Sequence, residues 1–319
     1  MTDLAPLEMN SRPLAMSRLT RFPPAVSELT FTNLFVWRKS RPAWLVESRE
    51  TLLFVVAPEP ESPARFVMGA PVGPPLTAAE VKAAVPGFRG YIRVPEPAAG
   101  QLERDGLLLE RDDDNADYVY CVKDLAELKG EKYQKKRNLV RRCLRNYECR
   151  YEPITPALVP ECMAMQTLWC QARDCGRDPG LCHEFDAIRE LFIHFETLQL
   201  LGGAVRVNGT VQAFAVGEAL APGTAVCHFE KAMPAVQGLG QVINQWFAAE
   251  ALRDFEFLNR EQDLGLPGLR QAKLSYRPHH RVVKYHARLP EEAGSGRLAP
   301  EADPRVCDRQ TAPGEGAAA

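Results

Sequence analysis

The chain has 319 residues, 45% of them hydrophobic, which is enough apolar sequence for one large core or two medium ones. Its formal net charge of -2 excludes a protein that is basic over its whole surface, although a local basic face remains possible. Nine cysteines without regular spacing, and no leader-like N-terminal segment, predict a cytoplasmic protein.

The first part of the chain predicts a disordered segment followed by an α/β unit. Residues 1–26 contain several prolines and no periodicity, so we expect them to be disordered. Thr77 and Glu80 form a capping-box pattern at the start of a predicted helix over 77–85. The apolar run 51–57 is far shorter than the roughly 20 residues of a membrane helix. The predicted strands span residues 44–47, 52–56, 65–68, 90–94, 107–110 and 118–122.

A strongly basic segment closes this unit at residue 147. Between residues 129 and 145, eight basic residues stand against one acid, Glu131, while Val140, Leu144 and Tyr147 recur at helical spacing. This pattern predicts an amphipathic helix with one basic side. Such a side suits a tRNA backbone or anionic lipid head groups, although many charge runs are only solvated surface. The residues assigned to it are Lys132, Lys135, Lys136, Arg137, Arg141 and Arg142.

A second α/β unit is predicted over residues 148–289. Its clearest local signal is Asn208-Gly209, a two-residue turn that joins strands at 203–207 and 211–218 into a hairpin. Residues 290–319 are rich in Ala, Gly, Pro and Glu, and we expect them to be disordered. The other predicted elements are strands at 149–154, 225–231, 255–259 and 282–287, and helices at 156–172, 184–198, 240–253 and 269–276.

Several blocks of the sequence resemble one known family. The blocks lie at 31–37, 118–125, 129–138, 228–232 and 259–278. They are similar to the C-terminal domain of phosphatidylglycerol lysyltransferase, and the resemblance extends over residues 27 to 288. It implies an α/β fold of two tandem acetyltransferase-like (GNAT) domains with mixed central sheets, divided at residue 147, with the second domain catalytic. It also implies transfer of an aminoacyl group from charged tRNA without a cofactor.

Direct acyl transfer needs a base for the acceptor, donors for the developing oxyanion and an acid for the leaving group. Alternation along the predicted strand places His228 and Glu230 on one face, so Glu230 is the candidate base and His228 could position it or move a proton. The simpler interpretations are an ion pair at a strand end and a packed imidazole.

The predicted helix at 269–276 carries three further catalytic candidates. Arg270, Lys273 and Tyr276 are spaced so that they could converge on one groove. The two cations would neutralise a phosphate or an oxyanion, and Tyr276 would be the general acid. The alternative is a basic surface helix with a packed tyrosine.

Binding candidates surround this chemistry. The polar run 259–263 follows a predicted strand, and within it Arg260 could hold a carrier phosphate and Asp263 an ammonium group. Glycines at the start of the helix near residue 240 could cradle a donor phosphate, or could form only a turn. The substrate-binding candidates are Asn259, Arg260, Asp263 and Asn244, and the phosphate-binding candidates are Gln237, Gly238 and Gly240.

Together these patterns predict an aminoacyltransferase that moves an amino acid from aminoacyl-tRNA to an amine or hydroxyl of a small molecule or lipid. One alternative is an acyltransferase that uses a coenzyme A thioester, and another is a non-enzymatic module that binds tRNA or the anionic inner face of a membrane. No DNA partner is expected. The spacing of Cys170, Cys175 and Cys182 with His183 matches no standard zinc motif, so we expect no metal site.

Overall fold

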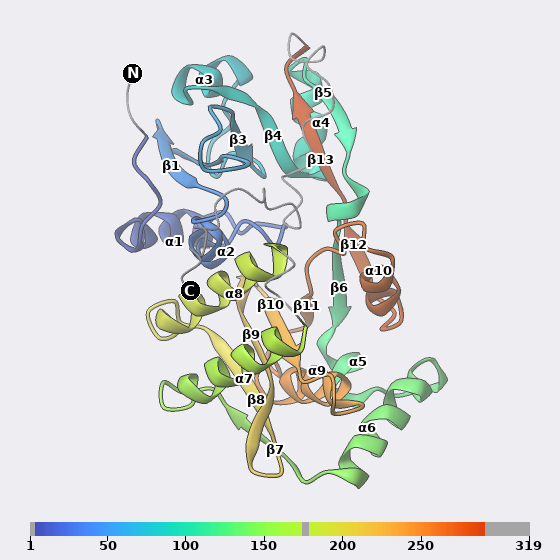
Figure 1. Cartoon of the computed structure of the whole chain (residues 1–319). Coiled ribbons are helices and arrows are strands. Elements are labelled where there is room, and N and C mark those ends of the chain that lie inside the picture. The colour runs from blue at the N-terminus through green and yellow to red at the C-terminus, as the bar shows by residue number, and fades with distance from the viewer. Residues whose placement is uncertain (1–3, 174–178, 291–319) are drawn as a thin grey trace, which may run out of the picture.

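Two mixed β-sheets form the framework of the protein (Figure 1). The computed structural model describes residues 4–173 and 179–290. The first sheet has the spatial order β1 (Ala43–Ser48), β2 (Thr51–Val56), β3 (Arg65–Met68), β4 (Phe88–Pro95), β13 (Lys284–Arg288) and β5 (Leu108–Arg111). The second has the order β12 (His280–Val282), β6 (Asp117–Cys121), β11 (Phe257–Asn259), β10 (Thr224–Ala232), β9 (Thr210–Ala221), β8 (Leu201–Val207) and β7 (Cys149–Pro153).

Both sheets repeat one pattern, in which an antiparallel meander ends in a parallel pair. Strand β3 pairs with β4 after a crossover through α3 (Ala78–Ala84), and β10 pairs with β11 after a crossover through α9 (Leu239–Glu250). A parallel pair requires such a crossover, whereas antiparallel neighbours need only a turn. The repeated pattern agrees with the predicted tandem GNAT-like α/β fold.

A long two-stranded ribbon connects the sheets. Strands β5 and β6, linked through η2 (Asp113–Asn115), run antiparallel to the consecutive strands β13 and β12. Strand β6 therefore lies in the second sheet although it precedes residue 147, and β13 lies in the first sheet although it is the last strand (Figure 1). The sheets thus exchange strands across the expected division, and the domain boundary stays a prediction.

Helices cover the sheets in three core clusters. One cluster joins both sheets through α1 (Arg12–Arg21), α2 (Phe31–Trp37), α7 (Val159–Ala172) and α8 (Pro179–Ile193). The opposite face of the second sheet packs on α5 (Val122–Glu127), α6 (Gln134–Asn146) and α9. The outer face of the first sheet packs on α3 and α4 (Glu96–Arg104).

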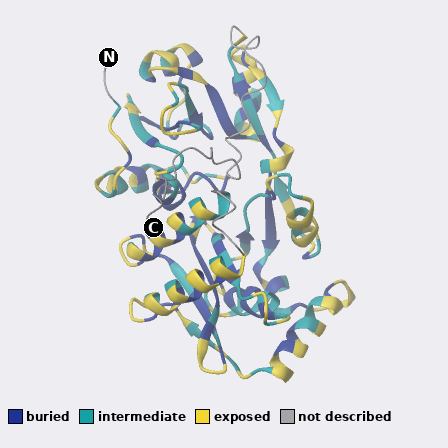
Figure 2. Cartoon of the chain, viewed as in Figure 1, coloured by how far each residue is buried: buried dark blue, intermediate teal, exposed yellow. Residues whose placement is uncertain are grey.

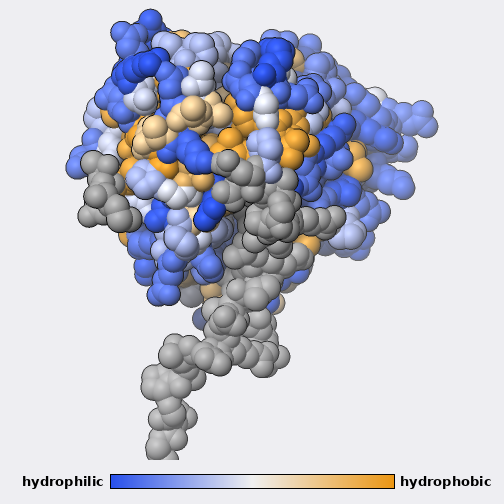
Figure 3. Space-filling model, turned by 90° about the horizontal axis from the view of Figure 1, so that it is seen from above, coloured by the Kyte–Doolittle hydropathy of each residue, from blue (hydrophilic) through white to orange (hydrophobic). Residues whose placement is uncertain are grey.

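The burial pattern follows these clusters, with buried residues concentrated in the strands and on the helix faces that contact them (Figure 2). Seen from the end that carries the first sheet, apolar residues gather on the surface inside a hydrophilic surround (Figure 3). Within residues 4–173 and 179–290, no helix has the length and apolar character needed to cross a membrane.

Two local predictions are confirmed in detail. The backbone N–H of Glu80 donates to Thr77 Oγ1 at 3.3 Å, and the N–H of Thr77 donates to Glu80 Oε2 at 2.8 Å, which completes the capping box. Asn208 and Gly209 have φ values of 50° and 87° between paired β8 and β9, as a hairpin turn with two left-handed residues requires.

The expected disorder of residues 1–26 is wrong for the described part of that segment. Residues 9–11 form the short helix η1 (Met9–Ser11), and α1 follows with Ala15 and Leu19 buried. The N–H of Leu7 donates to the carbonyl of Ala43 at 2.8 Å, which fastens the segment to β1. Of the expected disordered tail, residues 291–319 lie outside the described residues.

Buried charges occupy the middle of the connecting ribbon. Lys284 Nζ lies 2.6 Å from both Glu28 Oε2 and Asp117 Oδ1, and these three side chains are at most 2% exposed. Arg93 Nε lies 3.1 Å from Glu28 Oε1, and Arg93 also pairs with Asp112. Charges removed from water are costly unless each keeps its partners, so this cluster is sensitive to the loss of one member.

We predict that Lys284→Met lowers the free energy of unfolding by about 3–5 kcal/mol, because Glu28 and Asp117 lose their shared cation. Denaturant unfolding at neutral pH measures the effect, and Lys123→Met, at an exposed position, provides the matched control. A loss no larger than that of the control would contradict the role given to this cluster.

Candidate functional site

The second sheet splits between its two parallel strands. Strands β10 and β11 pair only through residues 224–226 and 257–259. Strand β10 then continues to residue 232, whereas the chain leaves β11 after residue 259. Side chains from the far half of β10 can therefore meet side chains from the loop after β11.

Glu230 of β10 and Arg260 of this loop form the centre of the site. Arg260 Nη2 lies 3.0 and 3.1 Å from the two carboxylate oxygens of Glu230, and Asn244 Nδ2 on α9 donates to Oε2 at 2.9 Å. The Glu230 and Arg260 side chains remain 22% and 15% exposed. The predicted base is thus oriented from two sides and is still accessible to a small reacting group.

Two tyrosines form a wall around the guanidinium. Arg260 lies 5.6 Å from the ring centre of Tyr120 on β6 and 5.0 Å from that of Tyr276, which follows α10 (Pro267–Leu274). Burial raises the pKa of Tyr276 above its ordinary value although Arg260 acts in the opposite direction, so the phenol is protonated at neutral pH. Tyr120 was not among the sequence candidates, because only the strand exchange brings β6 here.

A β-bulge separates His228 from Glu230. Cys227 pairs with Gly217 while Phe229 pairs with the adjacent Val216, so His228 is an extra residue in β10. As a result, Cys227 packs in the cluster with α9 and Phe229 in the cluster with α7 and α8. The expectation that simple alternation places His228 and Glu230 on one face is therefore wrong.

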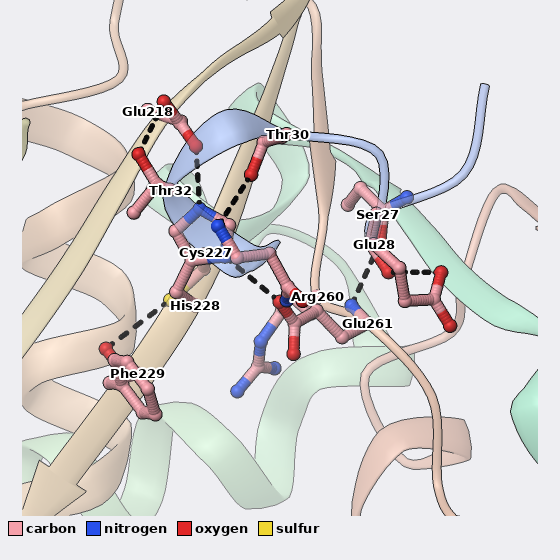
Figure 4. A network of polar contacts seen from close by, with 12 residues as sticks. Ser27, Glu28, Thr30, Thr32, Glu218, Cys227, His228, Phe229, Arg260 and Glu261 are labelled. Atoms are coloured by element: carbon pink, nitrogen blue, oxygen red, sulfur yellow. Dashed lines mark hydrogen bonds and ion pairs between the residues drawn. The ribbon is translucent and has the colours of Figure 1, made fainter. Parts of the chain in front are cut away.

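His228 lies between two carboxylates (Figure 4). Its Nε2 is 2.9 Å from Glu218 Oε1 and its Nδ1 is 3.0 Å from Glu261 Oε1. Burial lowers the pKa of His228, but the two carboxylates outweigh burial and raise the pKa to about 9. At neutral pH both ring nitrogens donate, so the imidazolium holds Glu261 in place and has no lone pair with which to act as a base.

Asn259 is turned away from the Glu230 side of the loop. Its Nδ2 donates to Asp117 Oδ2 at 2.9 Å, and its Oδ1 accepts from the N–H of Glu261 at 2.8 Å. The residue is 1% exposed. The structure thus gives this predicted binding residue a role in shaping the loop.

Asp263 and Arg270 form a separate ion pair outside the centre. Arg270 Nε lies 2.8 Å from Asp263 Oδ2, and Arg270 Nη2 lies 2.7 Å from Asp114 Oδ1. The hydroxyl of Tyr118 also donates to Asp263, at 2.5 Å. The predicted convergence of Arg270 with Tyr276 is therefore wrong, because these acids hold the Arg270 side chain.

Lys273 supports the loop after β11 by binding its backbone. Its Nζ donates to the backbone carbonyl of Arg260 and, at 3.3 Å, to that of Glu261. Burial, aided by the charge of Arg260, lowers the pKa of Lys273 to about 8. Lys273 thus acts on Arg260 through its backbone, whereas the sequence prediction had it neutralise the substrate directly.

The glycine loop before α9 has a packing role. Gly238 has a φ of 89°, and a Cβ on it would lie 2.4 Å from the carbonyl oxygen of Leu139 on α6. A glycine is therefore needed for α9 to approach α6. The space beside Gly240 is open, and Gln237 is exposed. Donor binding by these residues stays a prediction.

The predicted basic side divides into three groups. Lys132 pairs with Asp124 at 2.8 Å, and Arg137 donates to the carbonyls of Leu128 and Gly130. Lys136 turns inward and lies 4.1 Å from the ring of Tyr276. Lys135, Arg141 and Arg142 are exposed to solvent, as Lys132 also is beside Asp124.

The sequence contained a signal for the inward turn of Lys136. Lys136 follows Tyr133 by three residues and precedes Val140 and Cys143 by four and seven, and those three residues are buried. This spacing places all four on one helix face.

The described residues hold no cluster of His, Cys, Asp and Glu suited to a metal, and Cys175 lies outside them.

Comparisons with known proteins place these observations in a family. The family described as phosphatidylglycerol lysyltransferase, C-terminal, matches residues 19–288. A conserved protein of unknown function from Bacteroides thetaiotaomicron is 30% identical, with a TM-score of 0.81, over 91% of this chain and 100% of its own. No match was found among curated proteins.

Two more distant solved structures share the fold. The C-terminal domain of a putative lysylphosphatidylglycerol synthetase from Agrobacterium fabrum is 15% identical, with a TM-score of 0.64, over 88% of this chain and 91% of its own. L-PGS from Bacillus licheniformis is 13% identical, with a TM-score of 0.61, over 87% of this chain and 91% of its own.

We predict that His228→Gln removes a pH-dependent part of the stability. Because the pKa of His228 is raised from 6.5 to about 9 on folding, its contribution is complete below about pH 6.5 and is lost as the pH rises through about 9. The wild-type protein should therefore lose on the order of 2–3 kcal/mol more than the variant over this range. Denaturant unfolding across the range measures this difference, and equal pH profiles would show that the imidazole is not held as a cation.

Proposed function

The chain belongs to the family of the C-terminal domain of phosphatidylglycerol lysyltransferase, and we propose that it moves an amino acid from aminoacyl-tRNA to an amine or hydroxyl acceptor. The observation that carries this proposal is the partly exposed Glu230–Arg260 pair at the split of the second sheet. It supplies a proton acceptor beside a fixed positive charge, which direct acyl transfer requires.

In the proposed reaction, Glu230 takes the proton from the acceptor's O–H or N–H as the oxygen or nitrogen attacks the aminoacyl ester carbon. Asn244 and Arg260 keep the carboxylate in one orientation through their hydrogen bonds. A base held in this way does not need to reorganise before it acts, which is a main source of the rate enhancement by general bases.

The other half of the reaction is assigned to Arg260 and Tyr276. The carbonyl oxygen gains negative charge in the tetrahedral intermediate, and the Arg260 guanidinium is the nearby group that stabilises it. As the ester bond breaks, the leaving ribose oxygen takes a proton from the Tyr276 phenol. Arg260 favours the phenolate that remains, since its charge lowers the pKa of Tyr276 against the effect of burial.

The exposed part of α6 supports a polyanionic donor. Lys135, Arg141 and Arg142 face solvent on the helix that also sends Lys136 to the site. Exposed cations on a helix that also reaches the site favour a nucleic-acid backbone, because phosphate contacts position such ligands. The glycine loop adds no separate support for coenzyme A, since packing on Leu139 accounts for Gly238.

The proposal is tested by asking which label moves. Purified protein is incubated with radiolabelled aminoacyl-tRNAs or labelled acyl-coenzyme A, each with a lipid extract and with a mixture of small amines. Transfer from tRNA is expected, and the acceptor fraction that gains label identifies the acceptor class. Transfer from coenzyme A alone would overturn the proposal, as would the absence of transfer from either donor.

We predict that Glu230→Gln lowers the transfer rate by about a hundredfold or more, because the amide keeps the shape of the side chain but cannot accept the proton. Single-turnover kinetics with the active donor give the rate. Glu256→Gln, at an exposed carboxylate outside the site, is the matched control and should transfer normally. A Glu230→Gln protein as fast as this control would show that Glu230 is not the base.

A further inference from the structure

Lys136 differs from the other cations of its helix in where its amine lies. The residue is partly buried, whereas the preceding Lys135 is exposed. Its Nζ lies 4.1 Å from the Tyr276 ring centre, and the Arg260 guanidinium lies 5.0 Å from the same ring. Two cations from separate elements therefore contact one aromatic side chain at the proposed transfer site.

The protein does not neutralise this pair of cations fully. Glu230 is the carboxylate in contact with Arg260, through Nη2, and among the described residues no carboxylate forms an ion pair with Lys136. Burial and the charge of Arg260 both lower the pKa of Lys136, while Glu230 raises it. Like charges placed together at a partly buried site are costly unless an anion joins them.

Both cations also have N–H groups without an acceptor among the described residues. The structure assigns partners to Nη2 of Arg260, but within the described residues none to its Nε or Nη1. Lys136 contributes three N–H groups, which meet a ring face and, in the described part of the chain, no acceptor. An ammonium and a guanidinium with free N–H groups match the several oxygens of a phosphate better than the two oxygens of a carboxylate.

We propose that Lys136 and Arg260 form a phosphate-binding subsite at the transfer centre. The inference rests on the proposed function, because it assigns the subsite to a substrate of that reaction. The phosphate belongs either to the 3′ end of a tRNA or to the head group of a phospholipid acceptor. Bound there, it would bring the reacting ester or hydroxyl beside Glu230.

The test measures binding without turnover. Isothermal titration of the full chain is carried out with two probes, the trinucleotide CCA for the tRNA end and glycerophosphoglycerol for the lipid head group. We expect Lys136→Met to weaken binding of one probe about tenfold, the loss typical of one charge-assisted contact. The probe that is affected identifies the source of the phosphate.

Two further variants complete the test. Arg145→Met removes an exposed cation from the same helix and should change the affinity less than twofold, about 0.4 kcal/mol. Lys136→Gln replaces Lys136→Met if the apolar side chain impairs folding, which circular dichroism and thermal melting reveal. If both Lys136 variants bind the probes like the wild type, or if the wild type binds neither probe, the subsite is overturned.

The two proposals fail in different ways. Lys136-dependent binding without any aminoacyl transfer would leave the subsite standing and remove the proposed function. Transfer that depends on Glu230, together with probe binding that does not depend on Lys136, would support the proposed function and overturn the subsite. A loss of affinity in Arg145→Met equal to that in Lys136→Met would point to general charge on the helix and would also overturn the subsite.

Discussion

The amine of Lys284, buried between Glu28 and Asp117, is the contact on which the rest of the arrangement depends. It lies where the connecting ribbon passes from one sheet to the other. Because Lys284 belongs to the first sheet and Asp117 to the second, their ion pair holds the two sheets together. Asp117 also accepts from Asn259, which in turn fixes the N–H of Glu261. A continuous set of hydrogen bonds therefore runs from the sheet junction to the loop that presents Arg260.

The candidate site is assembled from both sides of the expected domain division. Tyr120 and Lys136 precede residue 147, whereas Glu230, Arg260 and Tyr276 follow it. The strand exchange makes this possible. Strand β6 lies beside β11, and the helices that follow β6, α5 and α6, pack in one core cluster with α9. The proposed chemistry thus depends on the junction between the sheets as much as on the second sheet itself.

The features that could be predicted from the sequence are those set by neighbouring residues. The capping box at Thr77 and the Asn208-Gly209 hairpin follow from neighbouring residues, and the strand that carries Glu230 was readable in the same way, while the role of Glu230 as base stays a prediction. The bulge at His228 was not predictable, since it is set by pairing with β9. The partners of Arg270 likewise come from distant segments, and α1 is ordered by tertiary packing that its own sequence does not indicate.

The position of β13 has a consequence for how the protein folds. This strand, residues 284–288, lies between β4 and β5 in the first sheet, with Ala287 fully buried. While the chain emerges from the ribosome, the edge strand β5 has no partner in that sheet until almost all of the described sequence has been made. Until then β4 and β5 have unpaired edges. During this interval the nascent protein is prone to misassembly and is a target for chaperones.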